Sequence, residues 1–250
     1  MEPKFVFLAF ITVSLAACGG GGTSNDSSSA QSSAAYSVVA PTQGAQSIYS
    51  ETLVDNLNNS VNRNIINTIL AVNGDGTFSV SFKDPNNNIV KTGTVDHSFY
   101  PQVYNYTSHG TEIDRTIIFP DGTSTKCVAS SNNSDSSGNP RLPGETIHVS
   151  YTETCGISVP ISYKITSLYV GQESITIPAG TYLAYKFQDT IVYTLPTGTT
   201  VTNSAIYWRS MTNLGNTLIK ASDTYTYSGV TPPQGATVSA TRTLQSQKLQ

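Results

Sequence analysis

Three turns of the same composition constrain the fold of this chain more than any other feature. Residues 120–123, 178–181 and 196–199 each read Pro-x-Gly-Thr. Proline presets the backbone of the first turn position, and glycine accepts the positive φ that closes a hairpin. Residues of alternating polarity flank these turns, and no helical pattern separates them. The repeated turn therefore predicts consecutive antiparallel hairpins.

Apolar residues that alternate with polar ones support strands along much of the chain. The clearest sets are Phe78, Val80 and Phe82; Ile147, Val149 and Tyr151; Val159, Ile161, Tyr163 and Ile165; and Phe187, Ile191, Tyr193 and Leu195, which Asp189 interrupts. The 14 tyrosines and the many β-branched residues point the same way. We predict an all-β protein with a single antiparallel meander that forms a curved open sheet or half-barrel. A β-sandwich is the alternative.

The segment 46–72 allows two interpretations. A helical stripe is suggested by apolar residues spaced four apart, namely Leu53, Leu57, Val61, Ile65 and Ile69. The asparagines between Asn56 and Asn64 and the β-branched residues around Ile66 favour strands instead. We expect two strands that meet at residues 58–60, with a helix as the alternative.

The N-terminus has the plan of a secretory signal. Lys4 precedes an apolar run from Phe5 to Leu15, and the small residues Ala16 and Ala17 follow. The run is shorter than the roughly 20 residues that a membrane-spanning helix needs. Residues 1–17 are therefore predicted to be a signal peptide.

Leu15-Ala16-Ala17-Cys18 resembles the lipobox of bacterial lipoproteins. The resemblance implies that Cys18 carries lipid, including palmitate, and becomes the first residue of the mature chain. Several acyl chains give durable attachment to a bilayer, whereas a single chain gives weak attachment. Because Gly19 and not aspartate follows the cysteine, the resemblance implies anchoring in the outer membrane of the cell envelope, on its periplasmic or its surface face. The membrane is the partner that this predicts.

The first residues of the mature chain favour a tether. Residues 18–42 are rich in glycine, serine and alanine and hold few large apolar side chains. Such a segment cannot bury enough surface to offset the entropy of ordering it. We predict a disordered tether over 18–42 and one β domain over 43–250.

Cys127 and Cys155 are the two cysteines that remain once Cys18 is assigned to lipid. In an oxidising compartment such a pair is typical of a disulfide. The bridge would close a loop of about 28 residues and contribute roughly 3–4 kcal/mol. A metal pair or a reactive thiol is the alternative, but histidine or cysteine partners at ligand spacing are missing. We predict a structural disulfide.

One segment resembles a second group of proteins. Residues 173–182, with Ala184 and Lys186, read as a strand, a Pro-Ala-Gly-Thr turn and a second strand, and Trp208 and Gly215 follow at matching places. This is similar to a hairpin carried by largely uncharacterised β-rich bacterial envelope lipoproteins. The resemblance spans 171–220 and implies a curved open sheet, which in some members shelters apolar ligands. It supplies no catalytic residues.

Charge argues against nucleic acid as a partner. The net charge is −3, only 12% of the residues are charged, and no basic cluster occurs. Catalytic signals are also weak, because no Gly-x-Ser-x-Gly elbow is present. His109, Glu112 and Asp114 could bind a metal, but turns and strand ends collect such residues anyway. We predict no cofactor, no metal and no catalytic residue, and expect that the protein is not an enzyme.

Tyrosines are the remaining candidates for a binding site. Tyr100, Tyr104 and Tyr106 form a cluster, and further tyrosines mark the later strands. Most such residues pack across strands, but a concave aromatic face could bind a lipid, a sugar or a peptide. The leading hypothesis is an envelope lipoprotein that binds or scaffolds another envelope protein, glycan or lipid. The alternatives are a periplasmic carrier of an apolar ligand in a half-open sheet, and a hydrolase.

Overall fold

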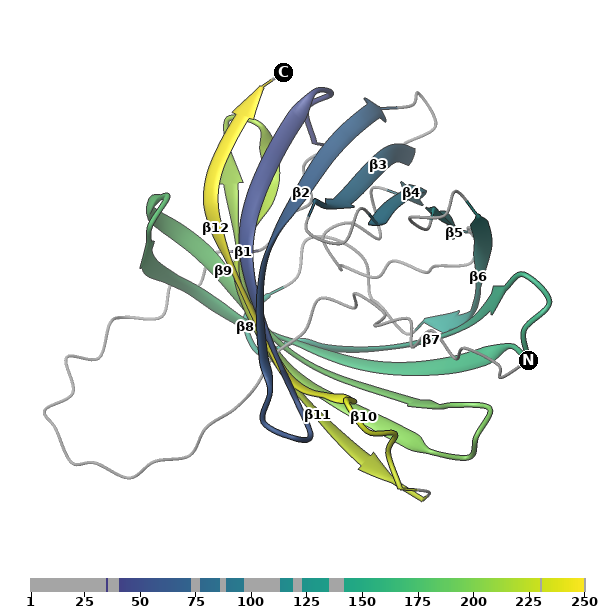
Figure 1. Ribbon diagram of the computed structural model, residues 1–250. Coiled ribbons are helices and arrows are strands. Elements are labelled where there is room, and N and C mark those ends of the chain that lie inside the picture. The colour runs from purple at the N-terminus through teal and green to yellow at the C-terminus, as the bar shows by residue number, and fades with distance from the viewer. Residues whose placement is uncertain are drawn as a thin grey trace, which may run out of the picture.

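The computed structural model describes residues 35, 41–72, 77–85, 89–96, 113–118, 123–134, 142–229 and 231–249. These residues form strands and turns (Figure 1). The strands are β1 (Ala45–Asp55), β2 (Ser60–Val72), β3 (Thr77–Asp84), β4 (Ile89–Asp96), β5 (Ile113–Ile118), β6 (Ser124–Ser134), β7 (Thr146–Cys155), β8 (Ile161–Ile177), β9 (Gly180–Thr194), β10 (Thr200–Thr212), β11 (Gly215–Ser228) and β12 (Thr237–Leu249). The described residues include no helix that is long and apolar enough to cross a membrane.

The strands make one antiparallel sheet. Each strand pairs with the strand before it and the strand after it in the chain, from β1 through to β12. The predicted all-β class and the single antiparallel meander are therefore confirmed. Short turns such as those between β1 and β2, β8 and β9, and β10 and β11 place each strand beside its sequence neighbour.

The sheet curves further than the open sheet or half-barrel that we expected. β1 pairs with β2 on one side and with β12 on the other, so the order of pairing returns to its start as a closed barrel. Ala45 lies opposite Leu249 at one end of the β1–β12 seam, and Asp55 lies opposite Thr237 at the other. In Figure 1 the purple β1 runs beside the yellow β12. No local pattern in the sequence encodes this pairing of the first strand with the last.

Segment 46–72 folds as two strands. β1 and β2 pair along their length, from Val54 opposite Ser60 to Gln46 opposite Thr68. At the turn, Asn58 has a φ of 62°, a backbone conformation that asparagine tolerates better than most residues. The preferred interpretation from the sequence is correct, and the helical spacing of the apolar residues is coincidental.

Two of the three Pro-x-Gly-Thr turns join neighbouring strands as expected. Residues 178–179 connect β8 to β9, and residues 195–199 connect β9 to β10. Gly180 and Gly198 both have positive φ, 136° and 86°. The third turn, at 120–122, lies outside the described residues, while β5 and β6 on either side of it pair antiparallel.

The inner face of the sheet carries the largest buried side chains. Aromatic rings stack across strands in two separate core clusters: Tyr151 of β7 stacks on Tyr163 of β8 at 4.7 Å, and Phe187 of β9 stacks on Tyr207 of β10 at 5.0 Å between ring centroids. The cluster of Phe187 and Tyr207 also contains Tyr49, Ile65, Tyr169, Ile219 and Leu244. For these tyrosines the structure favours cross-strand packing over a concave binding face.

The outer face is polar. Hydroxyl and amide side chains pair across neighbouring strands, as Thr52 does with Asn62 at 2.6 Å and Thr194 with Thr200 at 3.1 Å. Such pairs suit a face that contacts water. The predicted signal peptide and most of the predicted tether lie outside the described residues, so the domain boundaries remain predictions.

Candidate functional site

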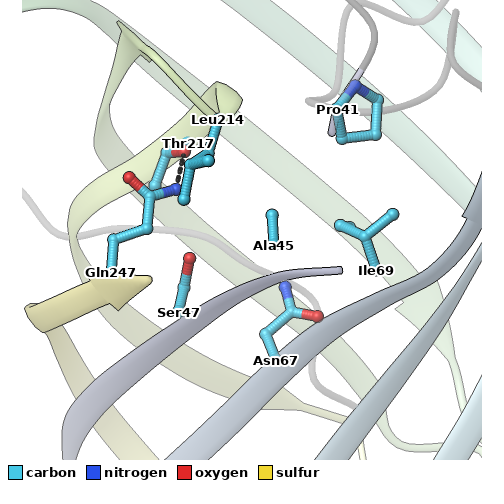
Figure 2. A pocket seen from close by; sticks show the side chains of 8 residues that line it. All are labelled: Pro41, Ala45, Ser47, Asn67, Ile69, Leu214, Thr217 and Gln247. Carbon is cyan, nitrogen blue, oxygen red and sulfur yellow. Dashed lines mark hydrogen bonds between the residues drawn. The ribbon is translucent and has the colours of Figure 1, made fainter. Parts of the chain in front are cut away.

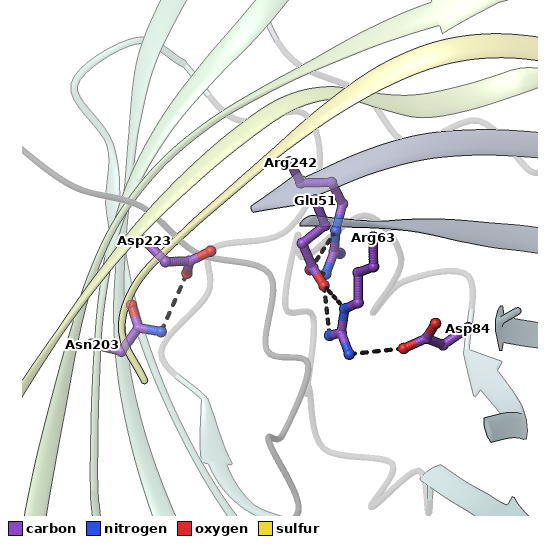
Figure 3. Close-up of polar contacts among 6 residues, drawn as sticks. All are labelled: Glu51, Arg63, Asp84, Asn203, Asp223 and Arg242. Atoms are coloured by element: carbon purple, nitrogen blue, oxygen red, sulfur yellow. Dashed lines mark hydrogen bonds and ion pairs between the residues drawn. The ribbon is translucent and has the colours of Figure 1, made fainter. Parts of the chain in front are cut away.

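A charged cluster lies on the inner face at the seam where β1 meets β12 (Figure 3). Its centre is the carboxylate of Glu51 on β1. Arg63 of β2 donates from Nε to Glu51 Oε2 at 2.5 Å, and Arg242 of β12 donates from Nε to Oε1 at 3.1 Å. One buried carboxylate thus joins three adjacent strands.

The cluster continues on both sides of these strands. Arg63 also donates from Nη1 to Asp84 Oδ2 at 3.0 Å, which brings in the end of β3. On the other side, Asn203 of β10 donates from Nδ2 to Asp223 Oδ1 of β11 at 3.3 Å. Asp223 in turn stabilises the charge on Arg242. Each of these side chains points to the interior of the sheet in Figure 3.

The electrostatics of the cluster fix its protonation. Burial raises the pKa of Glu51, but the charges and hydrogen bonds of Arg242 and Arg63 outweigh burial and hold that pKa below its ordinary value. Burial lowers the pKa of Arg242. The interactions with Glu51, and to a smaller extent with Asp223 and Tyr49, outweigh burial and raise that pKa above its ordinary value. Both groups are therefore ionised at neutral pH. Such a pair is suited to holding strands together and poorly suited to exchanging protons.

Asp189 interrupts the alternating apolar pattern of β9 in the sequence, and the structure shows why a charged residue occurs at this position. The carboxylate is buried on the inner face of β9, where Tyr207 Oη donates to it at 3.3 Å. Arg209 lies over the ring of the same tyrosine at 5.5 Å. A polar residue is retained in the core because its neighbours satisfy it.

A small pocket opens at the end of the sheet where β1 begins (Figure 2). The cavity itself has a volume of about 10 Å³, which is room for about one water molecule. Its polar lining comes from Ser47, Asn67, Thr217 and Gln247. Gln247 Nε2 donates to Thr217 Oγ1 at 2.7 Å, which orients both side chains. The lining carries no charge.

A second polar cluster lies on the outer face around Trp208 of β10. The indole Nε1 donates to Glu173 Oε1 at 2.5 Å. Lys186 and Lys220 lie over the ring at 5.4 Å and 5.7 Å, and Lys186 also pairs with Glu173 at 3.2 Å. We call these four residues the tryptophan cluster. Their strands are consecutive in the meander, so the hairpin turns place them side by side.

The predicted cysteine pair lies between neighbouring strands. Cys127 of β6 is directly opposite Cys155 of β7, and the two sulfurs are 2.08 Å apart. The carboxylate of Glu153 lies near this disulfide. Sulfurs bonded to each other are not thiolates, so in this form they do not offer the metal site considered as an alternative.

Several sequence-predicted residues cannot be placed. Cys18, the tyrosines Tyr100, Tyr104 and Tyr106, and the pair His109 and Glu112 lie outside the described residues. Asp114 belongs to β5, but its side chain is not described. His148 is exposed on β7, where its Nδ1 lies 3.1 Å from Thr166 Oγ1.

Neither the charged cluster nor the pocket was predicted from the sequence. A signal for the cluster was present, because Glu51 has the same strand parity as Tyr49 and Leu53, so its carboxylate had to face the core. The partner Arg242 could not have been found, since it is 191 residues away. The pocket combines residues from four separate strands and turns and left no local pattern.

Comparisons with known proteins yield structures only. No model of a protein family matches this chain, and no curated protein matches it. Two solved structures are similar. One is a protein thought to be exported, with a YmcC-like fold, from Bacteroides fragilis, with 11% identity and a TM-score of 0.47, over 85% of this chain and 100% of the other. The second is a protein thought to be a lipoprotein, from Parabacteroides distasonis, with 14% identity and a TM-score of 0.46, over 85% of this chain and 99% of the other.

Proposed function

We propose that this chain is a lipoprotein of the cell envelope that binds another envelope component without catalysing a reaction. Lipid on Cys18 would hold it at the outer membrane, and the tether would let the β domain reach its partner. The lipobox residues 15–18 support the anchor, and the glycine-rich residues after them support the tether. The envelope component is a protein, a glycan or a lipid.

The observation that carries the binding role is the tryptophan cluster. Trp208 is held by Glu173 and flanked by two lysines, so the ring has one orientation before any partner arrives. Tryptophan dominates the energetics of many interfaces, and a fixed side chain loses little entropy on binding. A partner with an acidic or aromatic side chain would complement the lysines and the ring.

The charges on the inner face argue for binding at the outside over an apolar carrier. An apolar ligand inside the sheet would have to lie against the charged side chains of Glu51, Arg242, Asp223 and Asp189, with which it makes no favourable polar contact. Sites for apolar ligands are lined mostly by apolar side chains. The seam of this sheet is instead lined by charged side chains.

Co-purification tests the proposal. The lipidated full-length protein would be extracted gently from membranes, captured, and its companions identified by mass spectrometry. We expect one stoichiometric envelope component with the wild type, and its loss with Trp208→Ala and with Lys186→Ala. Thr202→Ala, on the outer face of the same strand, is the matched control and should retain the component. A binding role is contradicted by the absence of any stoichiometric component in gently extracted wild-type samples.

A further inference from the structure

The turns at one end of the sheet carry no charge. In a meander every second turn lies at the same end, so the turns β1–β2, β7–β8, β9–β10 and β11–β12 share an end (Figure 1). Their described residues contain no lysine, arginine, aspartate or glutamate, and they are 56–59, 156–160, 195–199, 229 and 231–236. We call these residues the far rim. The segment before β1 joins the domain at the opposite end, where Thr42 donates its backbone N–H to the oxygen of Leu214 at 3.0 Å.

The far rim exposes aliphatic side chains on ordered turns. Ile157 and Val159 are 107% and 64% exposed, and Leu57 is 50% exposed. Ser158 closes the first of these turns, because its backbone N–H donates to the end of β7 at 3.0 Å. The second turn is held by Asp55, whose Oδ1 accepts from the backbone N–H of Leu57 at 2.8 Å. Side chains that project from a fixed turn lose little entropy when they are buried against a partner.

Contacts between turns make much of the far rim one surface. Asn56 donates from Nδ2 to the oxygen of Pro233 at 3.1 Å and accepts from the backbone N–H of Gly235 at 3.0 Å, which joins the β1–β2 turn to the β11–β12 turn. A Cβ built on Gly229 would lie 2.8 Å from the backbone oxygen of Gly198, so the β11–β12 turn also touches the β9–β10 turn. These turns therefore meet a partner together.

The opposite end of the sheet also exposes aliphatic side chains, but beside charged ones. Leu183 and Leu249 are 60% and 57% exposed. Leu249 follows Lys248 at the end of β12, and Glu145 precedes β7 at the same end. Charged groups are costly to bring below the lipid head groups, whereas uncharged turns with aliphatic side chains can enter the boundary between head groups and acyl chains. A lipid bilayer thus fits the far rim better than the opposite end.

We propose that the far rim rests on the bilayer that anchors the chain, with Leu57, Ile157 and Val159 inserted at the level of the head groups. This inference rests on the lipid anchor of the proposed function. Residues 18–42 can span at most roughly 80 Å when fully extended. The 11 residues of β1 rise by only about 36 Å, so the chain can run from the bilayer past the far rim to the end where it enters the domain.

The anchor and the far rim act together. A few aliphatic side chains bind a bilayer weakly and reversibly, as a single short acyl chain does. The anchor holds the far rim at a high effective concentration near the bilayer, so that weak insertion is enough to orient the domain. Without the anchor the same insertion does not retain the protein on the membrane.

Quenching by brominated lipid tests which end faces the bilayer. The lipidated full-length protein would carry Trp208→Phe, which removes its single tryptophan, in vesicles of phosphatidylcholine with brominated acyl chains. One sample adds Ile157→Trp on the far rim, and the matched control adds Leu183→Trp, which replaces an exposed aliphatic residue at the opposite end. We expect the fluorescence of Ile157→Trp to fall by roughly half relative to vesicles without bromine, because an inserted indole lies near the upper acyl chains. The control should change little.

A second reporter separates insertion from the affinity of the new indole itself. In Leu57→Trp, the added changes Ile157→Asn and Val159→Asn should reduce quenching about threefold, because they remove two of the inserting groups. The proposal is overturned if the Leu183→Trp control is quenched as strongly as Ile157→Trp, or if neither is quenched. It is also overturned if the asparagine changes leave the quenching of Leu57→Trp as it was.

Flotation of the vesicles distinguishes the failure of this proposal from that of the anchor. A protein that does not float with the vesicles lacks the anchor, and both proposals are then overturned. A protein that floats without the expected quenching overturns only the orientation by the far rim.

Discussion

Glu51 illustrates how a single side chain can organise the inner face of a sheet. Its two carboxylate oxygens accept from Arg63 and Arg242, one on each neighbouring strand. A buried ion that keeps its partners gains little net free energy, but a buried ion that loses them is costly. The cluster therefore stabilises one specific arrangement of strands at the seam, and its removal should have a larger effect than that of any exposed ion pair.

Replacement of Glu51 by glutamine should destabilise the domain in a way that depends on pH. At pH 7 we expect a loss of about 3–5 kcal/mol in the free energy of unfolding, because the buried Arg242 and the partly buried Arg63 each lose their nearest counter-charge and keep only Asp223 and Asp84. The pKa of Glu51 is lower in the folded state than its ordinary value of 4.5. Its contribution is therefore complete above that value and is lost as the pH falls through the lower folded pKa. Urea unfolding between pH 3 and pH 7 would measure this.

Glu145→Gln is the matched control for this experiment. Glu145 lies in the turn before β7 and accepts from the backbone N–H of Leu142 at 2.8 Å, away from any arginine of the seam. We expect its unfolding curve to follow that of the wild type at each pH. If the difference between Glu51→Gln and the wild type stays constant down to pH 3, the ion-pair account of the seam is wrong.

At the scale of elements, the hairpin turns were the most predictable feature. The Pro-x-Gly-Thr turns at 178–181 and 196–199 join consecutive strands because proline and glycine favour the turn whatever surrounds it. The two strands of 46–72 were also predictable, since asparagines favour a turn. Contacts between turns were not predictable, because they depend on how far the sheet curves.

Gly229 makes such a contact. Its φ is 94°, and a Cβ built on it would lie 2.8 Å from the backbone oxygen of Gly198 in the β9–β10 turn. Gly229→Ala should therefore lower the free energy of unfolding both through backbone strain and through displacement of that turn. We expect a loss of about 2–4 kcal/mol, of which roughly 1–2 kcal/mol is the cost of positive φ for alanine.

Gly235→Ala separates the two causes. Gly235 has a φ of 80° and nothing within 4 Å of its would-be Cβ, so only the backbone strain applies. Calorimetric melting of both variants should show a larger drop in Tm for Gly229→Ala than for Gly235→Ala. Equal drops would mean that the β9–β10 turn moves aside without cost.

At the scale of the whole molecule, the sequence predicted the class and the meander but not the closure. Alternating polarity fixes which residues face inward, and short turns fix which strands are neighbours in the chain. Whether the two ends of the sheet meet depends on the summed twist and bulges of every strand, as at Tyr169 and Trp208. The candidate site could not be predicted for the same reason. Glu51 meets Arg242 only once the sheet has closed, and Asn67 and Gln247 line one pocket only then.

The anchor makes a prediction for the molecule as a whole. Cys18→Ser removes the only residue to which the lipobox resemblance assigns lipid, and we expect the protein to move from the membrane fraction to the soluble fraction. Cell fractionation followed by immunoblotting would measure this. Cys127→Ser is the control: it should remain with membranes while unfolding more easily, by about 2–5 kcal/mol. A Cys18→Ser protein that stays wholly with membranes would contradict lipid anchoring.

Because β1 completes its pairing only with β12, the domain cannot finish folding until this thirteen-residue strand has been synthesised. A chain that ends before Thr237 leaves β1 and β11 with rows of free backbone donors and acceptors, which recruit other polypeptides as readily as the missing strand. Proteolytic removal of β12 would thus turn the closed sheet into a seed for self-association.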